Sequence, residues 1–88
     1  MKKTEVVNIR SGRSTKYIGR GSPFGNPYKI GRDGTREEVI EKFRKYFMSK
    51  PELQQMVRDE LQGERLGCYC KPLPCHGDVF VEYLDSLE

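Results

Sequence analysis

The sequence has no run of 18 or more apolar residues, so we expect no membrane-spanning segment. Its first ten residues carry two lysines but no continuous apolar stretch, and we therefore expect no signal peptide. Cysteine and histidine are scarce, with three and one among 88 residues. An odd number of cysteines, two of them only two residues apart, argues against a disulfide scaffold and predicts a reducing cytoplasmic location.

Apolar residues recur with the spacings of strands and helices, which predicts a folded domain although 33% of the residues are charged. Alternating and β-branched apolar residues predict strands at residues 4–10, 16–19 and 65–70. Helical spacing predicts helices that begin near residues 36, 51 and 76. We therefore predict one small α/β domain over residues 1–88, with a short sheet of about three strands packed by about three helices.

Local signals mark the ends of two of these helices. Thr35 and Glu38 have the spacing of a capping box, which predicts a helix start at residue 36. Pro51 suits the first turn of the next helix, and Gly63 is placed to end it.

Charge is distributed unevenly along the chain. Residues 1–36 contain nine basic and two acidic side chains, a net charge of +7, whereas seven basic and eleven acidic side chains in residues 37–88 give −4. The basic half suits an anionic partner such as nucleic acid or a nucleotide phosphate. It could equally be a solvated, loop-rich surface, so charge alone does not decide between these interpretations.

All three cysteines and the single histidine lie within residues 68–76. Cys68, Cys70, Cys75 and His76 could together bind zinc, which prefers four tetrahedral sulfur or nitrogen ligands. The spacing fits less well, because C-x-C is tighter than usual and two adjacent residues would have to reach one ion. Three ligands with water, or no metal at all, stay open.

The same cluster permits a catalytic and a structural interpretation. Cys75 precedes a predicted helix, whose dipole would favour a reactive thiolate, and His76 or Asp78 could act as its base or orienting group. In the structural alternative, Cys68 and Cys70 are small core residues, and Asp78 is the helix cap.

The segment of residues 20–28 is rich in glycine and proline and suits a ligand-binding loop. Arg20, Ser22 and Asn26 offer a guanidinium, a hydroxyl and an amide, while Gly25 would let the backbone approach a phosphate or sugar phosphate. It matches no named nucleotide motif, and a rigid surface loop is the structural alternative.

A phosphate could also bind at the helix start near Gly77. If the loop and this helix start converge, the two candidate sites become one.

The two motifs together resemble a family of small phage and bacterial proteins catalogued as a domain of unknown function. The signature reads S-P-x-G-N-P followed by L-x-C-x-C-x-P-x-x-C-H-G-D-x-L, and the match covers nearly the whole chain. Phe80 stands where the family tends to have leucine. The resemblance implies a phage-type accessory protein in which both motifs share a site, with matches at Gly25, Asn26, Pro27, Cys68, Cys70, Pro72, Cys75, His76, Gly77 and Asp78.

Three functional hypotheses follow. The first is a domain that binds, or acts on, a nucleotide or other phosphorylated ligand at a pocket between the loop and the helix start. The second is a zinc-stapled nucleic-acid-binding module that uses the basic half. The third is a phage-type modulator that binds a host protein, with the cysteine cluster serving structure. None of the three involves a membrane.

Overall fold

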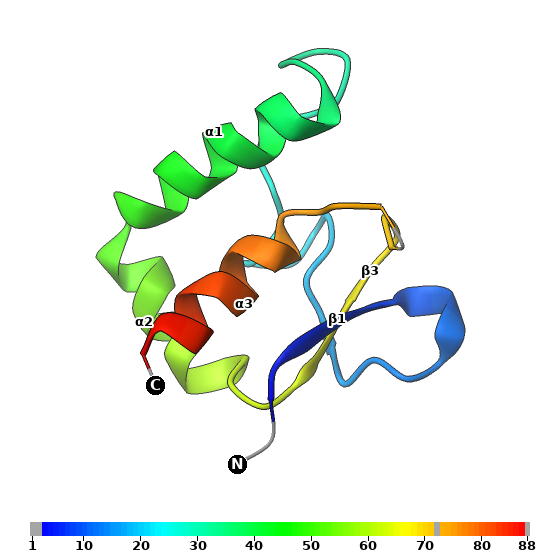
Figure 1. The fold of residues 1–88 in the computed structure, drawn as a ribbon, viewed down its shortest axis with the longest axis vertical. Helices are drawn as coiled ribbons and strands as arrows, with labels where there is room; N and C mark the ends of the chain where they lie inside the picture. Colours follow the sequence, from blue (N-terminus) through cyan, green and yellow to red (C-terminus); the bar gives the residue numbers. More distant parts are fainter. Residues whose placement is uncertain (1–2, 72, 88) are drawn as a thin grey trace.

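The computed structural model describes residues 3–71 and 73–87 and has a mixed α/β fold (Figure 1). Its elements in chain order are β1 (Glu5–Asn8), a 3-10 helix η1 (Ile9–Ser11), β2 (Lys16–Tyr17), α1 (Arg36–Met48), α2 (Pro51–Glu60), β3 (Arg65–Cys68) and α3 (Gly77–Ser86). The prediction of a small sheet of three strands with three α-helices is confirmed for this part of the chain. Pro72, one of the signature matches, lies outside it.

The three strands form one parallel sheet in the order β1-β3-β2. Leu66 of the central strand pairs with Val6 on one side and Lys16 on the other. Because the strands are parallel, their carboxyl ends lie at the same edge of the sheet. In Figure 1, α3 lies between the sheet and α1. Helix α2 follows α1 and lies near the C-terminal end of α3.

The strands are shorter than the sequence predicts, and Asn8 explains the first difference. Its side-chain oxygen accepts a hydrogen bond from the Arg10 amide at 2.8 Å, which turns the chain into η1 instead of continuing the strand. Its side-chain amide donates to the Lys71 carbonyl at 2.7 Å. The other two strands stop at Tyr17 and Cys68, where the chain turns toward the segments that carry both motifs.

The helix starts are as predicted, while one helix end is not. The Thr35 hydroxyl accepts from the Glu38 amide and the Glu38 carboxylate accepts from the Thr35 amide, which completes the capping box. Pro51 begins α2, but this helix ends at Glu60 rather than at Gly63. Gly63, with φ of 78°, lies in the turn toward β3, and its amide donates to Thr4 Oγ1.

A cluster of aromatic rings forms the core between the sheet and the helices. Phe80 of α3 packs edge-on against Phe43 and Phe47 of α1, with ring centroids 5.5 and 5.4 Å apart. Leu66 and Ile18 are fully buried in the same core. This packing fixes the start of α3 against the sheet and α1. No helix in the described ranges is both long enough and apolar enough to span a membrane.

Candidate functional site

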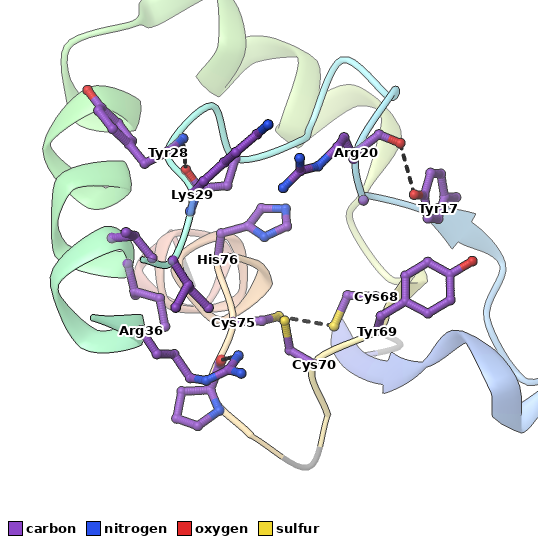
Figure 2. A pocket seen from close by; sticks show the side chains of 16 residues that line it. Tyr17, Arg20, Tyr28, Lys29, Arg36, Cys68, Tyr69, Cys70, Cys75 and His76 are labelled. Atoms are coloured by element: carbon purple, nitrogen blue, oxygen red, sulfur yellow. Dashed lines mark hydrogen bonds between the residues drawn. The ribbon is translucent and has the colours of Figure 1, made fainter. Parts of the chain in front are cut away.

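A pocket of about 400 Å³ opens at the carboxyl ends of β2 and β3 (Figure 2). Tyr17, the last residue of β2, and Cys68, the last residue of β3, form part of its wall. The loop before α1, the first turns of α1 and the segment that leads into α3 supply the rest. The pocket therefore lies where the ends of parallel strands, a loop and a helix start meet.

The two sequence motifs meet in this pocket. Arg20 and Asn26 of the loop line it, as do Cys75 and His76 from the segment before α3 (Figure 2). Residues 29–67 separate the motifs in the sequence, and the fold brings them together because both follow strands of one parallel sheet.

Three residues that were predicted to bind a ligand, Ser22, Gly25 and Gly77, do not line the pocket. The Ser22 hydroxyl donates to the Gly19 carbonyl at 2.7 Å and accepts from the Phe24 amide at 3.3 Å, which closes the loop on itself. A Cβ at Gly25 would lie 3.0 Å from the Gly19 carbonyl oxygen, and one at Gly77 would lie 2.6 Å from Ile18 Cδ1. Gly25 thus permits the loop to fold closely on itself, and Gly77 permits the start of α3 to pack closely against Ile18 and Val6.

His76 lines the pocket but is engaged with the backbone. Its Nε2 lies 2.8 Å from the Ile18 carbonyl oxygen, to which it donates, and its ring packs edge-on against Phe43 at 5.2 Å. Only 8% of the residue is exposed. Burial lowers the pKa of His76 below its ordinary value, and hydrogen bonding to the Ile18 and Phe24 carbonyls opposes this only in part.

Asp78 holds the entrance of α3. Its Oδ2 accepts from the Cys75 amide at 3.2 Å, and its Oδ1 accepts from Lys71 Nζ at 2.8 Å. The interpretation of Asp78 as the helix cap is wrong, because His76 is the N-cap of α3 and makes no side-chain cap hydrogen bond. Asp78 lies in the first turn, reaches back to the Cys75 amide and does not line the pocket. Among the described hydrogen bonds, none joins the Cys75 sulfur to the side chain of His76 or Asp78. The predicted catalytic trio therefore stays a prediction.

Two cysteine sulfurs are in contact at one wall of the pocket. Cys68 Sγ and Cys75 Sγ lie 3.1 Å apart, and Cys75 Sγ also accepts from the Gly77 amide at 3.3 Å (Figure 2). The hydrogen bond from Cys75 lowers the pKa of Cys68 to about 6, with help from the backbone amides of Cys70 and Lys71 and the Lys71 charge. The same contact, together with burial, raises the pKa of Cys75, which keeps the shared proton.

The predicted zinc ligands were Cys68, Cys70, Cys75 and His76. Within residues 3–71 and 73–87, no group of three His, Cys, Asp or Glu side chains is arranged to hold a metal ion. His76 Nε2 is occupied by the Ile18 carbonyl, and all three cysteines are free thiols. The geometry thus gives the zinc prediction no support.

Several further side chains that were not predicted as site residues line the pocket. They include two cations, Lys29 and Arg36, and two exposed aromatic residues, Tyr17 and Tyr69. The charge asymmetry was the signal for the cations, since both belong to the basic half of the chain. Nothing in the local sequence marked the tyrosines, because their role depends on where the strands end.

Comparison with known proteins assigns the chain to a family. Residues 1–86 match the family described as "Domain of unknown function (DUF4326)", and the chain belongs to this family of uncharacterised small domains. It is 40% identical over 86 residues to a protein of Enterobacteria phage T4 named "Uncharacterized 12.4 kDa protein in nrdA-td intergenic region". That match covers 93% of this chain and 78% of the phage protein. The chain matches no solved structure.

Proposed function

We propose that the pocket binds a small phosphorylated ligand, and specifically a nucleotide. The observation that carries this proposal is the charge of the pocket wall. Arg20, Lys29 and Arg36 all line it, and no Asp or Glu is among the described residues that do. A wall with cations and no carboxylate suits an anion, and guanidinium groups suit a phosphate in particular.

The cations of the pocket are available to a ligand. No ion pair of the described residues involves Arg20, Lys29 or Arg36. The Arg36 guanidinium donates to the Pro74 carbonyl at 3.2 Å, which holds it near the pocket and leaves its charge uncompensated. Uncompensated cations that converge on a cavity favour an anionic partner.

Two tyrosines at the pocket suit the flat ring of a base. Tyr69 and Tyr17 are 62% and 40% exposed, and their rings meet edge-on with centroids 6.4 Å apart. The Tyr17 hydroxyl donates to the Arg20 carbonyl at 2.9 Å, so this ring is tied to the cationic loop. An exposed aromatic ring beside these cations favours a nucleotide over a sugar phosphate, because bases stack on aromatic side chains.

The position of the pocket adds general support. Open sheets of parallel strands bind ligands outside the carboxyl ends of the strands, and this pocket lies there. Its volume of about 400 Å³ falls within the range usual for small-molecule sites.

The other two functional hypotheses have less structural support. A zinc-stapled nucleic-acid module needs ligands that the described residues do not bring together. Binding of a host protein stays a prediction without a contact or surface that favours it. The three free thiols agree with the cytoplasmic location that we continue to propose.

Calorimetric titration with nucleoside monophosphates, ribose 5-phosphate and inorganic phosphate tests the proposal. We expect the nucleotides to bind most tightly. Arg36→Gln should weaken binding of every phosphorylated compound about tenfold or more, because it removes a charge-assisted hydrogen bond. Tyr69→Ala should weaken the nucleotides by a similar factor and leave ribose 5-phosphate unchanged.

Arg10→Gln is the matched control, because Arg10 is exposed and lies outside the pocket. It should bind all these compounds like the unaltered protein. The proposal fails if none of the compounds binds, or if Arg10→Gln weakens binding as much as Arg36→Gln does.

A further inference from the structure

The contact between Cys68 and Cys75 has a geometry that a purely structural pair of cysteines does not require. Both thiols are free, and their sulfurs are 3.1 Å apart. A disulfide bond is about 2.0 Å long, so the sulfurs need to approach by only about 1 Å. Both residues also line the pocket, which gives a small solute a route to them although each is only 2% exposed.

The positions of both Cys68 and Cys75 are fixed by neighbouring backbone and side-chain groups. Cys68 is fixed as the last residue of the central strand β3, which pairs with a strand on each side. Cys75 is fixed by two hydrogen bonds, from its own amide to the Asp78 carboxylate and from the Gly77 amide to its sulfur. Asp78, which accepts from the Cys75 amide, is itself held by an ion pair with Lys71. The sulfurs are therefore kept together by the fold.

Cys70 differs from this pair. It is half-buried and also lines the pocket, but among the described contacts its sulfur has no hydrogen bond to either of the other two. It therefore serves as an internal reference for a thiol in the same pocket without a partner.

We propose that Cys68 and Cys75 form a reactive thiol pair that a hydroperoxide oxidises to a reversible intramolecular disulfide. The proposal does not depend on nucleotide binding. In the first step the Cys68 thiolate attacks one peroxide oxygen, the O–O bond breaks, and the departing hydroxide takes the Cys75 proton to leave as water. Cys68 is then a sulfenic acid.

In the second step the Cys75 thiolate attacks the Cys68 sulfur. The S–S bond forms, the S–O bond breaks, and the hydroxide takes up a proton and leaves as a second water. Overall, two thiols lose two electrons and one hydrogen peroxide becomes two waters. A dithiol reductant returns the pair to its initial state by thiol–disulfide exchange.

The electrostatic surroundings favour Cys68 as the attacking residue. The hydrogen bond from Cys75, the amides of Cys70 and Lys71, and the Lys71 charge all stabilise its thiolate. Cys75 holds the proton and is placed to resolve the sulfenic acid.

The test is oxidation of the folded, reduced protein with hydrogen peroxide, followed by thiol counting and tandem mass spectrometry. We expect the three free thiols to fall to one, the intact mass to drop by two hydrogens, and the cross-link to join Cys68 to Cys75. Cys70→Ser should form the same cross-link at a similar rate. In Cys75→Ser, a dimedone label should accumulate on Cys68, because the thiol in contact with the Cys68 sulfur is absent.

Oxidation of the unaltered protein tests the proposal even if a variant fails to fold. The proposal is overturned if Cys70 is the first thiol lost, if the cross-link joins Cys68 to Cys70, or if Cys68 and Cys75 react only after denaturant is added.

Discussion

The loop of residues 20–28 and the segment of residues 68–78 form one pocket, but they use their polar residues differently. In the loop, Ser22 bonds to neighbouring backbone groups and Arg20 lines the pocket. In the second segment, Asp78 holds the backbone and the cysteines line the pocket. Each motif thus combines residues that maintain its shape with residues that face the cavity. A motif that looks uniformly functional in sequence divides into these two roles in three dimensions.

The largest effect should come from adding a methyl group at the start of α3, where it packs against β1 and the end of β2. A Cβ at Gly77 meets Ile18 Cδ1 at 2.6 Å and Val6 Cγ2 at 3.0 Å. Gly77→Ala should therefore lower the free energy of unfolding by about 1–3 kcal/mol, as overpacking of a core does.

Gly25→Ala is the matched change in the loop, where the nearest atom is the Gly19 carbonyl oxygen at 3.0 Å. We expect a smaller loss than for Gly77→Ala, because the loop is less enclosed. Urea denaturation of both variants measures the two losses, and an equal or reversed order would contradict this account of the packing.

The next largest effect is a pH dependence of the free energy of unfolding that originates at His76. Its folded-state pKa lies below the ordinary value of 6.5, so below pH 6.5 the unfolded chain binds a proton that the folded protein does not. The contribution to stability is therefore complete above pH 6.5 and declines as the pH falls toward the folded-state pKa. The decline should be up to about 1.4 kcal/mol per pH unit.

His76→Gln isolates this contribution, because an amide can still donate to the Ile18 carbonyl but does not titrate. Denaturation at pH 7.5 and 5.5 should show a smaller loss of stability for the variant than for the unaltered protein. Equal losses would mean that His76 is not held neutral by burial.

An effect similar to or smaller than that of His76 is expected for Asp78→Ala, which removes the hydrogen bond to the Cys75 amide and the ion pair with Lys71. The free energy of unfolding should fall by about 1 kcal/mol. Asp85→Ala, at an exposed acid of the same helix, should change it by less than about 0.5 kcal/mol. If Asp78→Ala leaves stability intact but abolishes ligand binding, Asp78 belongs to the pocket and not to the scaffold.

Features set by a few neighbouring residues could be predicted from the sequence. The capping box of Thr35 and Glu38 and the start of α2 at Pro51 depend on contacts within one turn, and both are observed. The extent of the first strand could not be predicted in the same way. Asn8 ends it with contacts to Arg10 and to Lys71, and the second of these spans 63 positions.

The candidate site shows the same limit. That Arg20 and Cys75 belong to one pocket could be hypothesised from their motifs, yet the lining by Tyr69 and Arg36 depends on the sheet order and the position of α1. Ser22 and Gly77 have residue types that suit ligand binding, yet Ser22 bonds to the Gly19 carbonyl, Gly77 packs against Ile18, and neither lines the pocket. Their predicted binding role stays a prediction.

Both motifs should form one binding site for a phosphorylated ligand. Titration of the ¹⁵N-labelled protein with a nucleoside monophosphate separates the contributions of the two motifs, because each backbone amide gives its own signal. We predict saturable shifts that follow one binding curve at amides of residues 20–28 and of residues 68–76, with little change at α2. Shifts confined to one motif, or none at saturating nucleotide, would contradict the account.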